Sequence, residues 1–303
     1  MNAPRMAPSV ARAVVIKVGG RVQQDPALAA ALAAAWRARR AAGGALVVVH
    51  GGGDEVSALQ RMMGVEPAFV AGRRVTSPSD IETLRMALSG SANKRLVARL
   101  VAAGVPALGL SGEDGALLAA RRNQPALGAV GAPAAVDVAL LAHLVAGGYL
   151  PVLSPLSADV DAGDGSALNV NGDDAASAIA AALGAEELLL VADVPGVLLG
   201  GEPATILDAA AAHCAIASGD ARGGMAAKLE AALAAILAGV GRVRIGDLAA
   251  IGDASRGTAI VARRDGLDDD EHDGRRAGHA PSGTTAPPDR AAPAAPHAAA
   301  QGV

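Results

Sequence analysis

Hydrophobic and polar positions along this chain repeat in one order: a short apolar run, then glycines or other turn residues, then an Ala/Leu-rich stretch with helical spacing. Residues 14–18 and 46–50 are the first two apolar runs, and helical patterns follow them over 27–42 and 54–63. Short β-branched runs of this kind are typical of buried parallel strands. Further runs continue the alternation, at 105–110, 149–154 and 188–191. Alternating strands and helices predict an α/β fold with a mainly parallel sheet covered by helices on both faces.

Several other segments complete the expected secondary structure. Helical spacing runs over 80–99 with an interruption near Ser89-Gly90, and a polar, Gly/Asp-rich stretch at 157–165 predicts a loop. The remaining expected elements are a small hairpin, three helices and two short strands, at 69–75, 138–146, 175–183, 224–238, 243–245 and 259–261.

The end of the chain has a different composition. Beyond residue 263 it consists mainly of Pro, Ala, Gly, Asp and Arg, with almost no large apolar residue. Such a segment cannot bury enough surface to offset the entropy of ordering. We therefore predict one folded domain over 13–263 and a disordered tail over 264–303.

Composition narrows the classes of function that the chain can have. Of 303 residues, 51% are hydrophobic, but only Trp36, Phe69 and Tyr149 are aromatic, and the net charge is −4. Nucleic-acid binding is therefore not expected, because it uses aromatic stacking and basic patches. The single cysteine, Cys214, excludes an intramolecular disulfide and is expected to be a small buried hydrophobe. No apolar stretch of about 7–15 residues precedes Lys17, so no signal peptide is expected, and the Ala-rich runs are interrupted well short of the roughly 18 residues of a membrane span. We therefore expect a cytoplasmic protein that does not contact membranes.

Glycines follow the first two expected strands. Gly19-Gly20 come directly after Lys17-Val18, and Gly51-Gly52-Gly53 come directly after His50, which we expect to be structural rather than a general base. Glycines let the backbone approach a ligand closely, and the start of the next helix offers free N–H groups to an anion. Each loop could be a simple tight turn, but two at the ends of parallel strands fall where α/β sheets bind ligands. We therefore predict a phosphate-binding site there.

The cations for a phosphate site must come from separate parts of the chain, because it contains no G-x-x-x-x-G-K-[ST] motif. Of the 26 Lys and Arg residues, only Lys17, Lys94 and Lys228 are lysine. A lysine retained in so arginine-rich a chain indicates a position that needs a compact ammonium, although chance retention is the alternative. We expect Lys17 and Lys228 to supply the positive charge.

Two polar segments offer candidates for binding a small substrate. Arg74, in the run Gly72-Arg73-Arg74-Val75-Thr76, could grip a carboxylate with its planar guanidinium or could be an ordinary surface cation. In Asn169-Val170-Asn171-Gly172-Asp173, the asparagines could bind a polar substrate while Asp173 holds the two lysines. The same segment also fits a turn with a helix N-cap, where Asn and Asp are favoured.

Together, these segments resemble the acetylglutamate kinases of the amino acid kinase family over about residues 13–262. Carbamate kinases, uridylate kinases and aspartokinases share the first lysine–glycine loop, but they lack the combination of HGGG, RRVT and NVNGD. The motifs that carry the resemblance stand in the family's order: Ile16-Lys17-Val18-Gly19-Gly20, His50-Gly51-Gly52-Gly53, Gly72-Arg73-Arg74-Val75-Thr76, Ala92-Asn93-Lys94, Gly109-Leu110-Ser111-Gly112-Glu113-Asp114-Gly115, Gly148-Tyr149-Leu150-Pro151-Val152, Asn169-Val170-Asn171-Gly172-Asp173 and Gly223-Gly224-Met225-Ala226-Ala227-Lys228.

The resemblance implies a fold and an activity. The fold is a three-layer αβα sandwich, with a lobe for the acidic substrate over about 13–165 and an ATP lobe over about 166–263. The activity is ATP-dependent phosphorylation of the side-chain carboxylate of N-acetyl-L-glutamate, the second step of arginine biosynthesis, with Mg²⁺ bridging the ATP phosphates.

The resemblance also implies a role for each matching residue. Lys17 and Lys228 stabilise the transferring phosphoryl group, and Asp173 orients them. The implied binding residues are Gly19, Gly20 and Gly52 for the phosphoryl group, Gly52, Gly53, Arg74 and Asn169 for acetylglutamate, and Asp193 to Gly196 for ATP.

Alternatives stay open within and beyond this family. The substrate could be another N-blocked acid, namely acetylaminoadipate, succinylglutamate, or a glutamate or aminoadipate carried on a protein. The chain could also be a non-catalytic sensor of amino acids or nucleotides with the same fold. Arginine-inhibited hexamers in the family carry a longer N-terminal helix than the dozen residues found here, so we expect a homodimer. The segment 245–258 looks short for the family.

Overall fold

The computed structural model describes residues 10, 12–70 and 72–262, so the tail predicted over 264–303 lies outside the described residues. An eleven-stranded sheet runs through the described part in the order β13-β15-β14-β10-β1-β2-β8-β6-β7-β9, with β5 also paired to β8. Eight of its pairings are parallel and three are antiparallel. The prediction of a mainly parallel sheet is confirmed.

The centre of the sheet is formed by the strands that the apolar runs predict. β1 (Ala13–Val18) lies between β2 (Ala45–His50) and β10 (Glu187–Val191), and every residue of these strands is buried. β14 (Val243–Gly246) continues the sheet beyond β10, and β8 (Leu150–Asp159) continues it beyond β2. Most residues of these strands are apolar because both faces of the sheet are covered, and the buried polar exceptions include Lys17, His50, Glu187 and Arg244.

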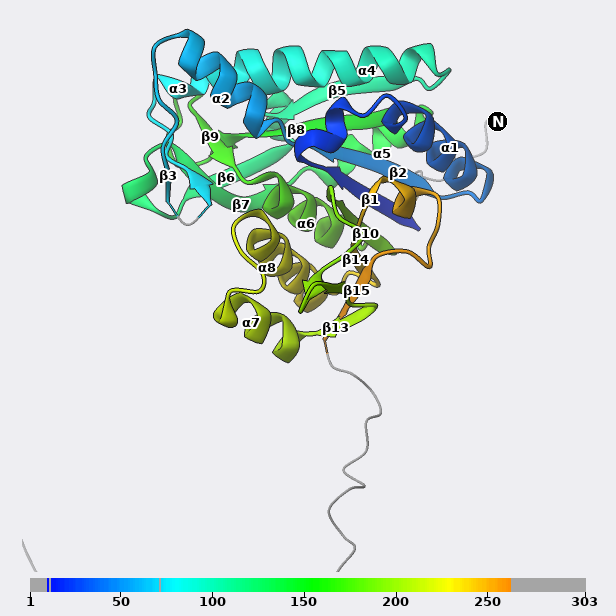
Figure 1. Ribbon diagram of the computed structural model, residues 1–303. Coiled ribbons are helices and arrows are strands. Elements are labelled where there is room, and N and C mark those ends of the chain that lie inside the picture. Colours follow the sequence, from blue (N-terminus) through cyan, green and yellow to red (C-terminus); the bar gives the residue numbers. More distant parts are fainter. Residues whose placement is uncertain (1–9, 11, 71, 263–303) are drawn as a thin grey trace, which may run out of the picture. The chain divides into compact units, whose positions relative to one another are not determined.

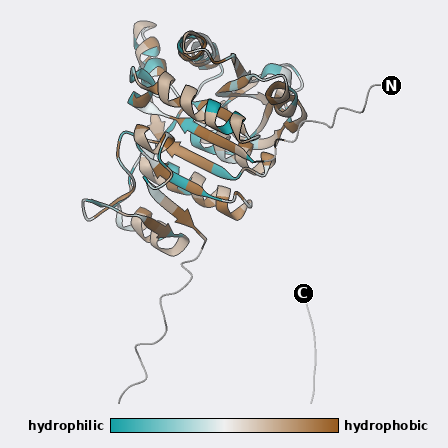
Figure 2. Cartoon of the chain, turned by 90° about the vertical axis from the view of Figure 1, so that its right-hand side faces the viewer, coloured by the Kyte–Doolittle hydropathy of each residue, from teal (hydrophilic) through white to brown (hydrophobic). Residues whose placement is uncertain are grey.

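Helices form a layer on each face of the sheet (Figure 1). α1 (Leu28–Ala41) and α4 (Asn93–Ala102) pack on one face, and α6 (Gly172–Leu183) and α8 (Gly224–Leu237) pack on the other. Figure 2 shows hydrophobic strands running between the helical layers. The three-layer αβα architecture that the resemblance implies is confirmed.

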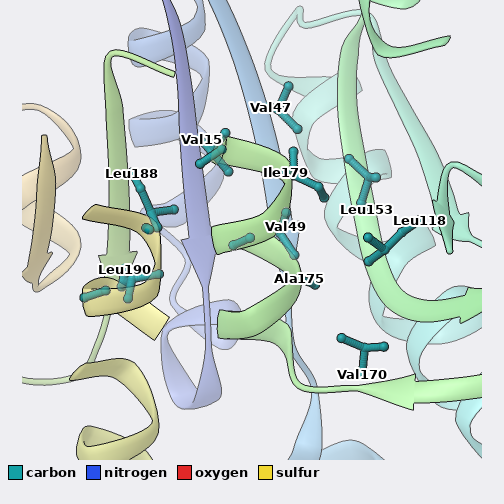
Figure 3. Close-up of a cluster of buried hydrophobic side chains, with 14 of the residues drawn as sticks. Val15, Val47, Val49, Leu118, Leu153, Val170, Ala175, Ile179, Leu188 and Leu190 are labelled. Carbon is teal, nitrogen blue, oxygen red and sulfur yellow. The ribbon is translucent and has the colours of Figure 1, made fainter. Parts of the chain in front are cut away.

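The larger of the two cores lies between the sheet and α6 (Figure 3). Val15, Val49 and Leu188 extend from the strands, and Ala175 and Ile179 extend from the helix; all five are fully buried. Because successive strand residues point to opposite faces, the neighbours of Val15 on β1 belong to the second core, with α1 and α4. The core is aliphatic, as the scarcity of aromatic residues predicts.

The remaining elements surround this frame. The other α-helices are α2 (Gly53–Met62), α3 (Asp80–Leu84), α5 (Val138–Ala146) and α7 (Ala209–Ser218). Short 3-10 turns, η1, η3, η4 and η5, occupy Gly20–Gln24, Asp114–Ala116, Pro125–Leu127 and Leu248–Ile251. The other strands are β3 (Phe69–Val70), β4 (Arg73–Arg74), β5 (Ala107–Gly112), β6 (Leu118–Arg122), β7 (Val130–Val136), β9 (Ala167–Val170), β11 (Leu198–Leu199), β12 (Glu202–Pro203), β13 (Ile206–Asp208) and β15 (Thr258–Val261).

The structure differs from the expected elements in several places. β6, β7 and β9 are additional strands, and their alanine content hides them from a search for β-branched runs. The loop expected over 157–165 is partly strand, because β8 extends through Asp159 and pairs with β9. The expected helix break near Ser89-Gly90 is a π-helical segment, η2 (Arg85–Ala92), that joins α3 to α4. Cys214, on the unexpected helix α7, is exposed rather than buried.

Candidate active site

The glycine loops after β1 and β2 lie side by side at the carboxyl edge of the sheet. The Gly51 N–H donates to the Val18 carbonyl at 2.8 Å. A cavity of about 210 Å³ opens beside the loops, at the position where open α/β sheets bind ligands. Seven of the eleven residues that the sequence predicts for the site line this cavity: Lys17, Gly20, Gly52, Gly53, Arg74, Asn169 and Asp173.

Asp173 lies between the two predicted lysines. Its Oδ1 is 2.9 Å from Lys17 Nζ and 3.0 Å from Lys228 Nζ, and its Oδ2 is 3.1 Å from Lys228 Nζ. Lys17 is on β1, Asp173 on α6 and Lys228 on α8, so the cluster assembles only when the sheet and this helical layer pack together. The structure therefore brings together the three residues that we predict to act on the phosphoryl group.

Burial and mutual attraction set the charges of this cluster. The pKa of Lys17 falls to about 8, because burial disfavours the charged ammonium more than the attraction of Asp173 favours it. Burial by itself raises the pKa of Asp173, but the attraction of Lys17 and Lys228 outweighs it and holds that pKa below the ordinary value. At neutral pH, Asp173 is an anion and Lys17 is mostly protonated, so the cluster carries a net positive charge.

Two glycines leave space that a side chain would fill. A Cβ on Gly19 would lie 2.6 Å from Lys17 Nζ, so only glycine lets this ammonium lie over the loop. Gly52 is the N-cap of α2 and has a φ of 147°. A side chain at this position would clash with Leu88, because a Cβ would lie 2.7 Å from Leu88 Cδ2. These positions need glycine for steric reasons, as a close approach to a ligand requires.

Arg74 is a buried side chain fixed by hydrogen bonds, and not an ordinary surface cation. Its Nη2 donates to the Gly53 carbonyl and to Ser57 Oγ, both at 2.8 Å, and its Nη1 donates to Gln60 Oε1. The ring of Phe69 covers its guanidinium, with 4.7 Å from Cζ to the ring centroid. Burial lowers the pKa of Arg74, but an arginine remains charged at neutral pH. The structure thus places a fixed cation in the wall of the cavity.

The asparagines of the NVNGD segment have two different functions in the structure. Asn171 is the N-cap of α6, and its side chain accepts from the Asp173 N–H at 2.8 Å. The capping alternative is therefore correct for Asn171 and not for Asp173. Asn169 lines the cavity, where its Nδ2 donates to Thr76 Oγ1 at 2.9 Å.

Asp193 and Gly196 lie in the turn after β10 and do not line this cavity. The Asp193 side chain is exposed and 4.0 Å from Arg21 Nη1, in the turn that follows the first glycine loop. Gly196 is buried against Thr258, whose Oγ1 would lie 2.5 Å from a Cβ at that position. Because β10 is parallel to β1, both residues share the carboxyl edge of the sheet with Lys17. Their role in nucleotide binding stays a prediction.

His50 is fully buried next to the second glycine loop. Its Nδ1 donates to the Gly51 carbonyl at 2.7 Å, so its Nε2 accepts from Asn93 Nδ2 at 3.0 Å. Burial lowers the pKa of His50 to about 4, which keeps the ring neutral. Because both ring nitrogens are engaged, this geometry supports the structural role expected for His50.

The sequence does not predict a role for several residues near the cavity. Ser57 and Gln60 fix Arg74, and their spacing of four and seven residues from Gly53 is a helical signal that could have indicated a shared face of α2. Arg73 pairs with Asp174 at 2.6 Å, and Phe69 lies over Arg74. No sequence signal joins Arg73 to a helix that lies 101 residues further along the chain.

Comparison with known proteins identifies the family. The model of the amino acid kinase family matches residues 12–247. The acetylglutamate kinase of Chloroflexus aurantiacus is 46% identical over 242 residues, which cover 79% of this chain and 93% of that protein. The acetylglutamate kinase of Roseiflexus sp. is 41% identical over 255 residues, which cover 83% of this chain and 94% of that protein. These relatives confirm the resemblance that the motifs indicate.

A solved structure agrees with the sequence comparison. The structure of smu.665 from Streptococcus mutans UA159 superposes with a TM-score of 0.74 at 29% identity, covering 83% of this chain and 99% of that one. Both predicted lysines, Asp173, Arg74 and the two glycine loops lie inside the segment that the family model matches. The chain therefore belongs to the amino acid kinase family.

Proposed function

We propose that this chain is an acetylglutamate kinase, which transfers the γ-phosphoryl group of ATP to the side-chain carboxylate of N-acetyl-L-glutamate. A carboxylate oxygen forms a new bond to the γ-phosphorus, and the bond from that phosphorus to the β–γ bridging oxygen breaks. The products are N-acetyl-L-glutamyl 5-phosphate and ADP. The relatives named above, at 41–46% identity over most of the chain, support this substrate.

The observation that carries the proposal is the buried pair of lysines on one carboxylate. The nucleophile is already ionised at pH 7, so the reaction needs no general base, and the main obstacle is repulsion between the carboxylate and the polyphosphate. Phosphoryl transfer is therefore mostly a matter of positioning and of neutralising charge. Lys17 and Lys228, fixed by Asp173 at 2.9–3.1 Å, supply preorganised positive charge for this purpose.

Other residues of the cavity fit the two ends of the substrate. Arg74 faces the cavity as a fixed cation, and we assign to it the α-carboxylate of acetylglutamate, with Asn169 and Gly53 beside it. The backbone N–H groups of Gly19, Gly20 and Gly52 are assigned to the phosphoryl group. The acidic substrate then extends from β4 to the lysine cluster.

ATP and Mg²⁺ complete the proposal. The described residues contain no group of three or more His, Cys, Asp or Glu side chains that could hold a metal ion. Asp173, the acid in the cluster, is already occupied by two lysines. Mg²⁺ fits here as an ion that the ATP phosphates and water hold, which is its usual manner of binding with nucleotides. We assign the acidic substrate to a lobe over about 13–165 and ATP to a lobe over about 166–263, near Asp193 and Gly196.

The proposed assembly is a homodimer in the cytoplasm. Among the described strands, β5 pairs only with β8, and an unpaired strand edge of this kind can be covered by a second copy. Light scattering on the purified protein tests the dimer. No helix of residues 10, 12–70 and 72–262 has the length and hydrophobicity to cross a membrane.

The experiment that tests the function is ATP turnover by purified protein with Mg²⁺ and one acid at a time. N-acetyl-L-glutamate is compared with N-succinyl-L-glutamate, N-acetyl-L-aminoadipate and free glutamate. Preference for N-acetyl-L-glutamate supports the proposal. Preference for another blocked acid keeps the chemistry but changes the substrate, and no turnover with any of them favours a carrier-linked substrate or a sensor. The paired lysines speak against the sensor, because binding alone does not require phosphoryl-stabilising cations.

A further inference from the structure

Arg74 lies on β4, and this strand and its partner β3 bury few apolar side chains. Phe69 and Val70 make up β3 and are 53% and 56% exposed, and each of the two strands is only two residues long. A hairpin of this size is at best marginally stable in water without other contacts. The Arg74 guanidinium is held by Gly53, Ser57 and Gln60 of α2, so the position of the β4 backbone relative to the lysine cluster depends on further contacts.

Arg73 provides a contact from β4 to the helical layer. Its Nη1 is 2.6 Å from Asp174 Oδ2, and its Nη2 is 4.0 Å from Glu230 Oε2. Asp174 directly follows Asp173 on α6, and Glu230 lies two residues after Lys228 on α8. The Arg73 and Asp174 side chains are only 21% and 20% exposed, so this pair is less screened by solvent than an ordinary surface pair.

The two arginines of β4 both line the cavity but contact different helices. Arg74 donates to Gly53 and Ser57 on α2, whereas Arg73 pairs with Asp174 on α6. Gly72, just before them, lies against Gly223 at the start of α8, since a Cβ on Gly72 would be 3.7 Å from the Gly223 carbonyl carbon. A movement of β4 away from α6 would therefore carry Arg74 away from the lysine cluster.

We propose that Arg73 is a positioning residue: its ion pair with Asp174 clamps β4 onto α6 and so sets the distance between Arg74 and the Lys17–Asp173–Lys228 cluster. The clamp itself is a property of the fold, whereas its kinetic effect rests on the proposed function. If the acidic substrate extends from Arg74 to the lysines, a loose β4 weakens its binding. ATP, which β4 does not hold, binds as before.

A double-mutant cycle followed by amide hydrogen exchange tests the clamp without reference to any activity. The reporter is the Val75 N–H, which follows β4 and donates to the Ala68 carbonyl at 2.9 Å. Arg73→Gln and Asp174→Asn should each speed its exchange about tenfold, and the double variant should exchange no faster than either single variant. Unchanged exchange in both single variants, or additive effects in the double variant, would overturn the proposal.

Steady-state kinetics then test the consequence for the reaction. Arg73→Gln should raise KM for N-acetyl-L-glutamate about tenfold and leave KM for ATP within about twofold, as expected for the loss of one charged hydrogen bond. Arg121→Gln is the matched control, because its pair with Asp161 is exposed and contacts no site residue. Equal rises in both KM values would mean that Arg73 has only a general structural role. If the wild type phosphorylates none of the acids, the proposed function fails, and the exchange experiment still decides on the clamp.

Discussion

Two buried groups of charges lie on this sheet, and they differ in what their donors contact. Beside the cavity, Lys17 and Lys228 share one acceptor side chain, Asp173. On the β10–β14 side of the sheet, Arg244 pairs with Glu187 at 2.5 Å. Arg244 also donates to three backbone carbonyls, those of Ala250, Asp253 and Arg256.

This difference in partners indicates that one group stabilises the fold and that the other is suited to chemistry. One carboxylate neutralises Arg244, and rigid backbone acceptors satisfy most of its remaining donors. Lys17 and Lys228 together keep one positive charge that Asp173 does not neutralise. An unbalanced buried charge is costly for folding, but it is suited to binding an anion. We therefore assign stabilisation of the fold to the Arg244 group and the proposed phosphoryl transfer to the lysine group.

Arg244→Met should show the largest effect of all, and the effect should be on stability. Removing one partner of a buried pair leaves Glu187 uncompensated, which should lower the free energy of unfolding by about 3–5 kcal/mol. Turnover per folded molecule should stay the same, because Arg244 lies outside the candidate site. Urea denaturation and an assay below the unfolding transition measure both quantities. A loss of turnover with unchanged stability would reverse the roles that we assign to the two groups.

Lys17→Met should show the opposite pattern. The change removes a preorganised charge at the transferring phosphoryl group, so kcat should fall about 10²–10³-fold, or about 3–4 kcal/mol. The free energy of unfolding should change by less than about 1 kcal/mol, because Asp173 keeps Lys228 and the cost of burying Lys17 is removed. The same two assays apply. A variant that unfolds easily but retains its kcat would show that Lys17 is structural.

His50 adds a buried titratable group that is neutral. Its pKa is about 4 in the folded chain and about 6.5 when unfolded, so as the pH falls the unfolded chain binds the proton first. Stability that is fully present above pH 6.5 should therefore be lost between pH 6.5 and 4, by about 3 kcal/mol. Urea midpoints of the wild type and His50→Gln across this range measure the loss. Parallel curves for the two proteins would contradict the assignment.

The pH dependence of turnover sharpens the comparison with a smaller effect. Lys17 must be protonated to act, and its pKa is about 8 in the free enzyme. The ratio kcat/KM should thus fall above pH 8, by about tenfold per pH unit. In Lys17→Arg, whose guanidinium does not titrate in this range, any remaining activity should lack this decline. A flat profile for the wild type up to pH 10 would exclude Lys17 as the titrating group.

The sequence predicts the strands and glycine loops of the site better than the side-chain contacts that surround the cavity. The β-branched runs and glycines locate β1, β2 and the loops that follow, because periodicity and turn chemistry are local properties. The rarity of lysine indicates Lys17 and Lys228, and the structure joins both through Asp173. Each residue could be selected from its own neighbourhood in the sequence.

The parts that the sequence does not predict depend on distant contacts. β6, β7 and β9 are rich in small residues, and they become strands through pairing with β8 and with one another. Two further contacts form only when α2, β4 and α6 pack together: the hydrogen bond from Arg74 to Gln60 and the ion pair of Arg73 with Asp174. Packing between elements, rather than local propensity, decides such contacts.

The most direct test of the role of the lysines compares Lys228→Ala with Lys94→Ala. The chain has three lysines, and Lys94 is the one that donates to the Gly109 carbonyl, at 2.9 Å, instead of to Asp173. Turnover with N-acetyl-L-glutamate and ATP should fall about 10²–10³-fold in Lys228→Ala, with Tm little changed, and should stay near the wild-type value in Lys94→Ala. Near-full turnover in Lys228→Ala would contradict the role of the buried lysine pair in phosphoryl transfer.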